Sequence, residues 1–166
     1  MLRKLMVLVP VVALLALPSL ALAQFEAGNY ALELFGTGAS NQDFDAHQVS
    51  AGGELGYFLT KEAEVGIRQG VTWSDSENTP QIWNGDTRVF GNYHFDIDRW
   101  QPYVGAFLGY LYGDQVSDFW SAGPEGGVKY FVNSTTYIGF AVQYVIGFDS
   151  DSEEFFNYQL ALGFKN

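Results

Sequence analysis

The chain has 166 residues, 48% of them hydrophobic and 17% aromatic, and its 19 acidic and eight basic residues give a formal net charge of −11. A surface this acidic, with no basic patch to offset it, repels nucleic acid, so we expect no nucleic-acid partner. The chain has no cysteine, which excludes a disulfide framework, and its 19 glycines and many aromatic residues indicate sheet rather than helix.

Residues 1–23 have the pattern of a secretory signal peptide. Two basic residues precede an apolar run over 5–17, and the small-residue sequence Ala21-Leu-Ala23 ends the segment, with cleavage expected after Ala23. The alternative is a membrane anchor, which we disfavour because two prolines interrupt a run that is short for a bilayer-spanning helix. We therefore expect export, followed by one domain over 24–166.

Beyond residue 24, apolar side chains alternate with polar or small ones, which is the period of a β-strand with two different faces. The alternation recurs in eight segments whose lengths near ten residues suit tilted membrane strands. In the ambiguous fifth segment we place Val104, Leu108 and Tyr110 outward, because Gly105 and Gly109 then join other glycines on the inner face. The expected strands lie at about 25–36, 48–59, 63–74, 86–95, 102–112, 124–132, 136–147 and 156–164.

The expected connections alternate between short and long. We expect short turns at 60–62, 96–101 and 133–135, and longer acidic loops at 37–47, 75–85, 113–123 and 148–154. This asymmetry is typical of an outer-membrane barrel with both termini on its periplasmic side. A closed barrel has no edge strand, so Pro124 should begin a strand or sit at a bulge.

If the apolar face points outward, the polar face fills the interior. A lumen of eight strands is only wide enough to be filled by side chains, so we expect a plugged interior rather than a wide pore. Gln143 and Gln159 share this face with the charged residues. The predicted lumen network consists of Glu33, Glu54, Glu64, Arg68, Arg88, His94, Glu125 and Lys129.

The same alternation would also suit a lipocalin-like soluble barrel with its aromatic face inside. The placement of aromatic residues favours the membrane, because interface belts of Trp and Tyr flank membrane barrels. We expect one belt of Tyr57, Phe58, Trp100, Tyr103, Tyr130 and Tyr137, and a second belt of Trp73, Tyr112, Trp120 and Tyr144.

Two segments, GELGYFLTKEAEVG over 53–66 and PYVGAFLGY over 102–110, resemble strands of the small outer-membrane barrel or porin family. This group includes OmpX-like proteins and the OmpA transmembrane domain. The resemblance implies an integral outer-membrane protein whose partners are lipid, lipopolysaccharide and, during insertion, the barrel-assembly machinery. The last strand is similar to the family's assembly signal, although Lys165 and Asn166 follow its final aromatic residue. The signal residues are Phe156, Tyr158, Leu160, Leu162 and Phe164.

Some small outer-membrane barrels are enzymes that act on lipid A. The deacylase type uses a His-x-Ser pair, in which His is the base for a Ser nucleophile. Neither His47 nor His94 forms such a pair. The palmitoyltransferase type needs His, Asp and Ser; His47, Asp45 and Ser50 are possible by composition, but nothing in their spacing singles them out. We expect no catalytic site and no cofactor.

The long loops carry the remaining candidates. The acidic stretch 149–154 lacks the glycine and the spacing of an EF-hand, so we predict no metal site. A weaker hypothesis is that it bridges divalent cations to lipopolysaccharide phosphates. Exposed aromatic residues often anchor interfaces, although they could equally enter the lipid headgroup region. The candidates for surface contact are Phe44, Trp83, Phe119 and Trp120.

The sequence therefore predicts an all-β, eight-stranded, antiparallel up-and-down transmembrane β-barrel. We expect it to have a structural or surface-interaction role, in adhesion or envelope integrity, toward a ligand that the sequence does not identify. Two alternatives remain open, a lipid A-modifying barrel enzyme and a narrow channel.

Overall fold

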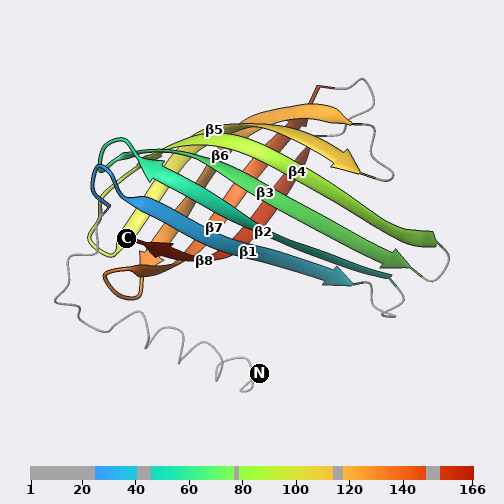
Figure 1. Cartoon of the computed structure of the whole chain (residues 1–166), viewed down its shortest axis with the longest axis horizontal. Helices are drawn as coiled ribbons and strands as arrows, with labels where there is room; N and C mark the ends of the chain where they lie inside the picture. Colours follow the sequence, from blue (N-terminus) through green and yellow to red (C-terminus); the bar gives the residue numbers. More distant parts are fainter. Residues whose placement is uncertain (1–24, 41–45, 77–78, 114–117, 149–153) are drawn as a thin grey trace, which may run out of the picture.

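The computed structural model describes residues 25–40, 46–76, 79–113, 118–148 and 154–166. Eight antiparallel strands close into a barrel in chain order, each paired with its neighbours and β1 paired with β8 (Figure 1). No helix in these ranges is long and apolar enough to cross a bilayer. The strands are β1 (Tyr30–Ser40), β2 (Ala46–Phe58), β3 (Ala63–Ser76), β4 (Thr79–His94), β5 (Trp100–Gly113), β6 (Phe119–Phe131), β7 (Thr136–Gly147) and β8 (Phe155–Lys165).

The fold class and the number and order of the strands are confirmed, and so are the short connections 59–62, 95–99 and 132–135. The predicted extent of three long loops, however, is wrong. Pairing continues to Ser40↔His47 in the first hairpin, to Ser76↔Thr79 in the second and to Leu111↔Phe119 in the third. Alternation of side chains reports the environment of the two faces, whereas backbone hydrogen bonds continue past the point where that contrast ends.

The position of Pro124 also differs from the expectation. It lies inside β6, opposite Ala106 of β5, and neither begins the strand nor marks a shift of register. The pairs with β7 stop at Ala122↔Ile146 and resume at Glu125↔Gln143 in the same register. Because proline has no N–H to donate, the chain accommodates it by a local interruption of the ladder rather than by a bulge.

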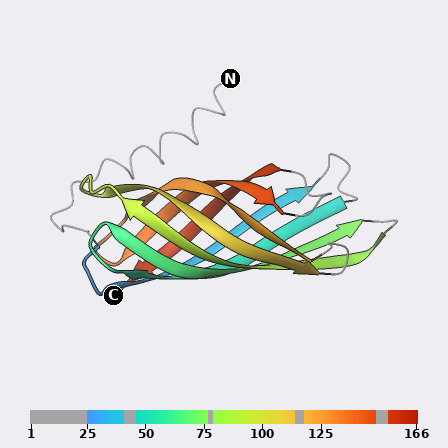
Figure 2. The same ribbon diagram turned by 90° about the horizontal axis from the view of Figure 1, so that it is seen from above.

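The two faces of the sheet are inverted relative to a soluble barrel. Leu34 and Leu160 on the outer surface are 55% and 61% exposed, whereas Glu64 and Arg68 in the interior are 1% and 2% exposed. Figure 2, seen from above, shows the strands wrapping around this interior. In β5 the outward placement of Val104 and Leu108 is confirmed. Such a molecule buries charge and exposes apolar surface, as a membrane barrel does.

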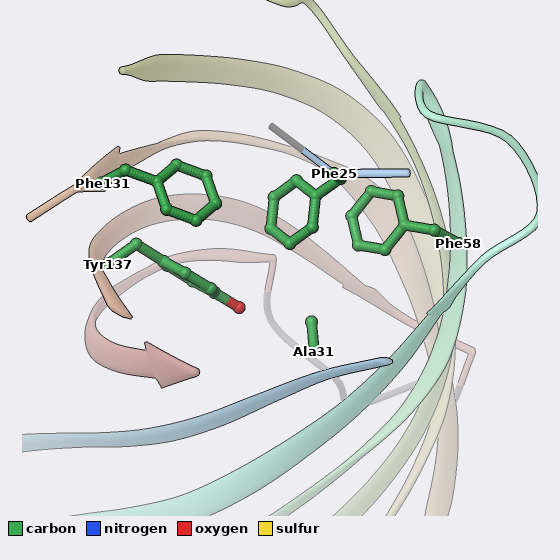
Figure 3. Packing of buried hydrophobic residues seen from close by; sticks show 5 residues of the cluster. All are labelled: Phe25, Ala31, Phe58, Phe131 and Tyr137. Atoms are coloured by element: carbon green, nitrogen blue, oxygen red, sulfur yellow. The ribbon is translucent and has the colours of Figure 1, made fainter. Parts of the chain in front are cut away.

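An aromatic cluster closes the end of the barrel that carries the short connections. The ring of Phe25, just before β1, stacks on Phe58 at 3.9 Å between centroids and meets Phe131 and Tyr137 edge-on at 5.1 and 5.7 Å. Figure 3 shows these rings converging above Ala31. The expected first belt is therefore partly wrong, because three of its members point into the lumen: Phe58, Tyr103 and Tyr137.

Candidate functional site: the closed lumen and the membrane-facing surface

The centre of the lumen is occupied by Arg68 of β3. Its Nε lies 2.6 Å from Oε2 of Glu54, while Nη1 and Nη2 donate to the two carboxylate oxygens of Glu125 at 2.9 and 3.3 Å. The guanidinium also lies 5.0 Å from the centroid of the Phe90 ring. Burial of a charge is tolerated only when its hydrogen bonds are made, and two carboxylates from different strands provide the acceptors here.

A second arginine extends this layer toward the long-loop end. Nη1 of Arg88 donates to Oε1 of Gln143 at 2.7 Å, and its Nε lies 2.7 Å from Oδ2 of Asp86. Gln143 in turn donates to Glu125 at 3.0 Å, which joins the two arginine groups into one network. The predicted lumen network omitted Asp86, although the expected fourth strand included it. The spacing of two residues from Arg88 places both on one face of the strand and was the available signal.

Lys129 of β6 organises a separate layer toward the short-turn end. Its Nζ lies 2.7 Å from Glu33 and 3.1 Å from Glu64. Nε2 of His94 lies 2.8 Å from Glu64, and the Tyr137 hydroxyl donates to Glu33 at 3.0 Å. Three aromatic rings lie within 6 Å of the Lys129 ammonium, so the cation is compensated by charge and by π-faces together.

The structure thus brings all eight predicted lumen residues into the interior, where each is at most 5% exposed. They form two groups, one around Arg68 and Arg88 and one around Lys129. The aromatic cluster of Phe25 lies at the end nearest Lys129. Over the length that these two groups occupy, the interior has the arrangement of a packed core and not of a water-filled pore.

The outer surface carries aromatic pairs toward both ends of the strands. At the short-turn end, rings pair between neighbouring strands, as in Tyr30–Tyr57 and Trp100–Tyr130, or between a strand and the connection after it, as in Tyr93–Phe95. At the opposite end the pairs are Tyr110–Trp120 and Tyr144–Phe156. Exposed Leu, Val and Ile side chains lie between these levels. Two aromatic belts around an aliphatic band are the outer surface of a transmembrane barrel.

The four aromatic residues predicted on surface loops have different positions. Trp83 lies on β4 opposite Trp73, and Phe119 and Trp120 lie at the start of β6. Their assignment to loops is therefore wrong, because these strands extend further than the side-chain alternation indicated. Trp83 and Trp120 are exposed on the barrel wall, at 49% and 54%. Phe44 lies outside the described residues.

The residues of the expected assembly signal line the outer face of β8, where each is exposed. Phe164 pairs with Leu32 and Leu162 pairs with Leu34, so β8 closes the barrel against β1. The two residues after the final aromatic take part in the closure. Lys165 pairs with Ala31, and Oδ1 of Asn166 accepts a hydrogen bond from the backbone N–H of Tyr30 at 2.8 Å.

The structure gives no support to the residues considered for catalysis. The Ser50 hydroxyl lies 2.9 Å from that of Thr72, and His94 is held by Glu64 inside the lumen. Asp45 and the acidic stretch 149–153 lie outside the described residues, as does the side chain of His47.

The fold is that of the small eight-stranded outer-membrane barrels. It is similar to the outer membrane protein OprG from Pseudomonas aeruginosa, with a TM-score of 0.63 at 13% identity over 88% of this chain and 99% of that one. It is also similar to the N-terminal β-barrel domain of OprF from the same organism, with a TM-score of 0.61 at 19% identity over 86% and 100%. Ail, the attachment invasion locus protein of Yersinia pestis, gives a TM-score of 0.52 at 13% identity over 84% and 99%. No protein-family model and no curated protein matches the sequence.

Proposed function

We propose that the chain is an integral outer-membrane protein, exported through a cleaved signal peptide, with a structural or surface-interaction role. Its lumen does not conduct, and its long-loop end and outer wall are the working surfaces. The partners in this proposal are outer-membrane lipid and lipopolysaccharide, together with the barrel-assembly machinery during insertion.

The observation that carries the proposal is the closure of the lumen. Two layers of buried ion pairs, centred on Arg68 and Lys129, fill the barrel between Arg88 and the Phe25 cluster, which lies at its short-turn end. Charged side chains packed against one another leave no continuous path for hydrated ions. The closed lumen does not support transport, and the described residues assemble no catalytic group. We therefore assign the function to the outer wall and the long-loop end.

The inverted burial supports a membrane location. If the protein were soluble, a partner would have to cover the exposed apolar band between the two aromatic belts, because large apolar patches on soluble proteins are interaction sites or aggregation hazards. In a lipid bilayer, the acyl chains cover the whole apolar band. The similarity to outer-membrane barrels points the same way, and Ail, whose name is attachment invasion locus protein, makes surface attachment a reasonable role to test.

Four measurements test the proposal. The full chain should fractionate with the outer membrane and lose its first 23 residues, which N-terminal sequencing detects. The unboiled protein should migrate differently from the boiled protein on a gel. In planar bilayers it should show no unitary conductance; steps of regular size would instead establish a narrow channel. A soluble species with no heat-dependent shift would overturn the membrane assignment.

A further inference from the structure

The barrel is not closed equally well at every seam. Strands β1 and β8 form six pairs, from Ala31↔Lys165 to Gly36↔Leu160, whereas β1 and β2 form 11 pairs and β2 and β3 form 13. Past Gly36, β1 continues to Ser40 with β2 as its only described partner, and the first part of β8 pairs only with β7. Figure 1 shows β1 and β8 together near the C-terminus and diverging toward the other end.

This divergence leaves backbone groups of 37–40 and 155–159 without partners across the seam, among the residues that the structure describes. If the register continued, residue 38 would face residue 158. Unpaired strand edges present N–H and C=O groups to which another molecule can bind, and natural barrels remove them by closure. An open stretch of seam in an otherwise complete barrel is therefore a place where a ligand can bind.

A cavity of about 320 Å³ lies inside the barrel at this opening. Four residues of the unpaired part of β8 line it, namely Phe155, Asn157, Tyr158 and Gln159, and Phe35 of β1 lines it from the other side of the seam. Residues from both sides of the unpaired part of the seam therefore line the cavity. Its volume lies at the lower end of the range of small-molecule sites.

The lining of the cavity is amphipathic and has no net charge. Its two charged residues, Arg88 and Asp86, form an ion pair with each other. Oδ1 of Asn84, another lining residue, is buried and has no hydrogen-bond partner among the described residues. Leu111 and Phe155 supply apolar surface beside these groups. Such a lining suits a polar, uncharged group that can donate a hydrogen bond, attached to an apolar portion.

The outside of the opening is a strip of apolar side chains at the level of an aromatic belt. Phe156 and Leu160 of β8 are 60% and 61% exposed, and the Phe156 ring packs against Tyr144 of that belt at 5.0 Å. Aromatic belts mark the membrane–water interface. The open seam therefore faces the depth at which lipid head groups end and acyl chains begin, where a head group can enter the cavity without crossing hydrocarbon.

We propose that this cavity binds a single-chain amphiphile with an uncharged, hydroxyl-bearing head group, which enters sideways from the membrane between β1 and β8. The head group lies in the cavity and donates a hydrogen bond to Oδ1 of Asn84. The alkyl chain leaves through the unpaired part of the seam and lies over Phe156 and Leu160. A membrane amphiphile is favoured over a water-soluble ligand because the opening passes through the wall beside this apolar strip.

The occupant is tested with the full chain folded in lipid vesicles and an alkyl glucoside that carries a diazirine at the start of its chain. After irradiation, the labelled peptides are identified by mass spectrometry. We expect saturable labelling of lumen-facing Phe35 and Gln159 that an excess of unlabelled alkyl glucoside removes. Thr72→Phe, which fills the cavity, should weaken this labelling about tenfold. The matched variant Ile67→Phe, on the outer face of the same strand, should not change it.

Labelling confined to outward residues, or labelling of the lumen that competitor does not reduce, would overturn the proposal. So would equal lumen labelling in Thr72→Phe and Ile67→Phe. The folding of each variant is checked by its heat-dependent gel shift. The competition measurement on the parent chain decides the question if Thr72→Phe does not fold.

The route of entry is tested by closing the seam with an engineered disulfide. The chain has no cysteine, so no native thiol competes with the introduced pair. Gly38→Cys combined with Tyr158→Cys joins the two strands where pairing is absent. In this variant, oxidation or a short bismaleimide should reduce lumen labelling about tenfold relative to the reduced form. Leu34→Cys combined with Leu162→Cys, at an existing pair of the same seam, should show no such dependence. Equal labelling with the open part locked would refute entry through the wall.

Discussion

Removal of one carboxylate from the centre of the lumen should destabilise the barrel strongly. In Glu125→Ala, Nη1 and Nη2 of Arg68 and Nε2 of Gln143 all lose their acceptor, at present distances of 2.9, 3.3 and 3.0 Å. Each buried donor left without a partner costs about 1–3 kcal/mol. Part of this cost is offset because a carboxylate no longer has to be desolvated.

The expected net loss is about 3 kcal/mol in the free energy of unfolding, at the lower end of the range for breaking a buried ion pair. The lower end applies because Arg68 keeps its contact with Glu54 at 2.6 Å, so it remains paired with one carboxylate. Glu125→Gln retains the volume and one acceptor oxygen and should therefore lose less. A loss of about 3 kcal/mol reduces the folding equilibrium constant by about two powers of ten.

The assay is urea-induced unfolding in lipid vesicles, with folded and unfolded forms separated by their mobility on an unboiled gel. The matched control is Glu62→Ala, which removes a carboxylate from the connection 59–62, where its partners Thr60 and Lys61 are exposed. Surface pairs of this kind contribute little, so the control should unfold like the parent. If Glu125→Ala unfolds within about 1 kcal/mol of the parent, the ion pairs of the lumen do not hold the barrel together and the reasoning fails.

Three further predictions concern other parts of the barrel. Phe25→Ala empties the centre of the aromatic cluster, so it should lower the free energy of unfolding by about 3–5 kcal/mol in the same assay. It should also speed amide exchange in β1 near Ala31, and unchanged exchange would argue against a closing role for the cluster. Leu162→Arg places a charge on the lipid-facing surface and should cost about 2–4 kcal/mol in vesicles, whereas Leu59→Arg in a short connection should be tolerated; equal effects would contradict the membrane position of β8. Gly123→Ala would bring a methyl group against the backbone oxygen of Tyr144, so β6 and β7 should separate locally, seen as faster amide exchange around Glu125. Retention of full protection would show that the backbone can yield there.

Some details of the site were accessible from the sequence in principle but needed the strand bounds to be read correctly. Asp86 shares one face of β4 with Arg88, so parity already placed it in the lumen, although it stood at the very end of the predicted strand. Trp83 and Trp120 look like loop residues when strands are ended where apolar alternation ends. The structure puts both on the wall because hairpin hydrogen bonds continue after the contrast between the faces is lost.

The sequence by itself determined the number of strands, their order and which face of each points inward. A strand alternates with a period of two, so a polar and an apolar face can be read from the residues alone. It also determined that Glu33, Arg68 and Lys129 share the interior, because face membership depends only on parity along each strand. Which partners they choose did not follow, since contacts across the lumen join strands far apart in the sequence.

Only the tertiary structure decided how the barrel is closed. In the structure, Lys129 forms ion pairs with Glu33 and Glu64, and the buried charges form two layers. Phe25 packs inside the short-turn end of the barrel. The β1–β8 pairing ends at Gly36↔Leu160 while both strands continue. Register across a seam between the two ends of a chain is fixed by stagger and by packing inside the lumen. No local pattern of residues encodes either of them.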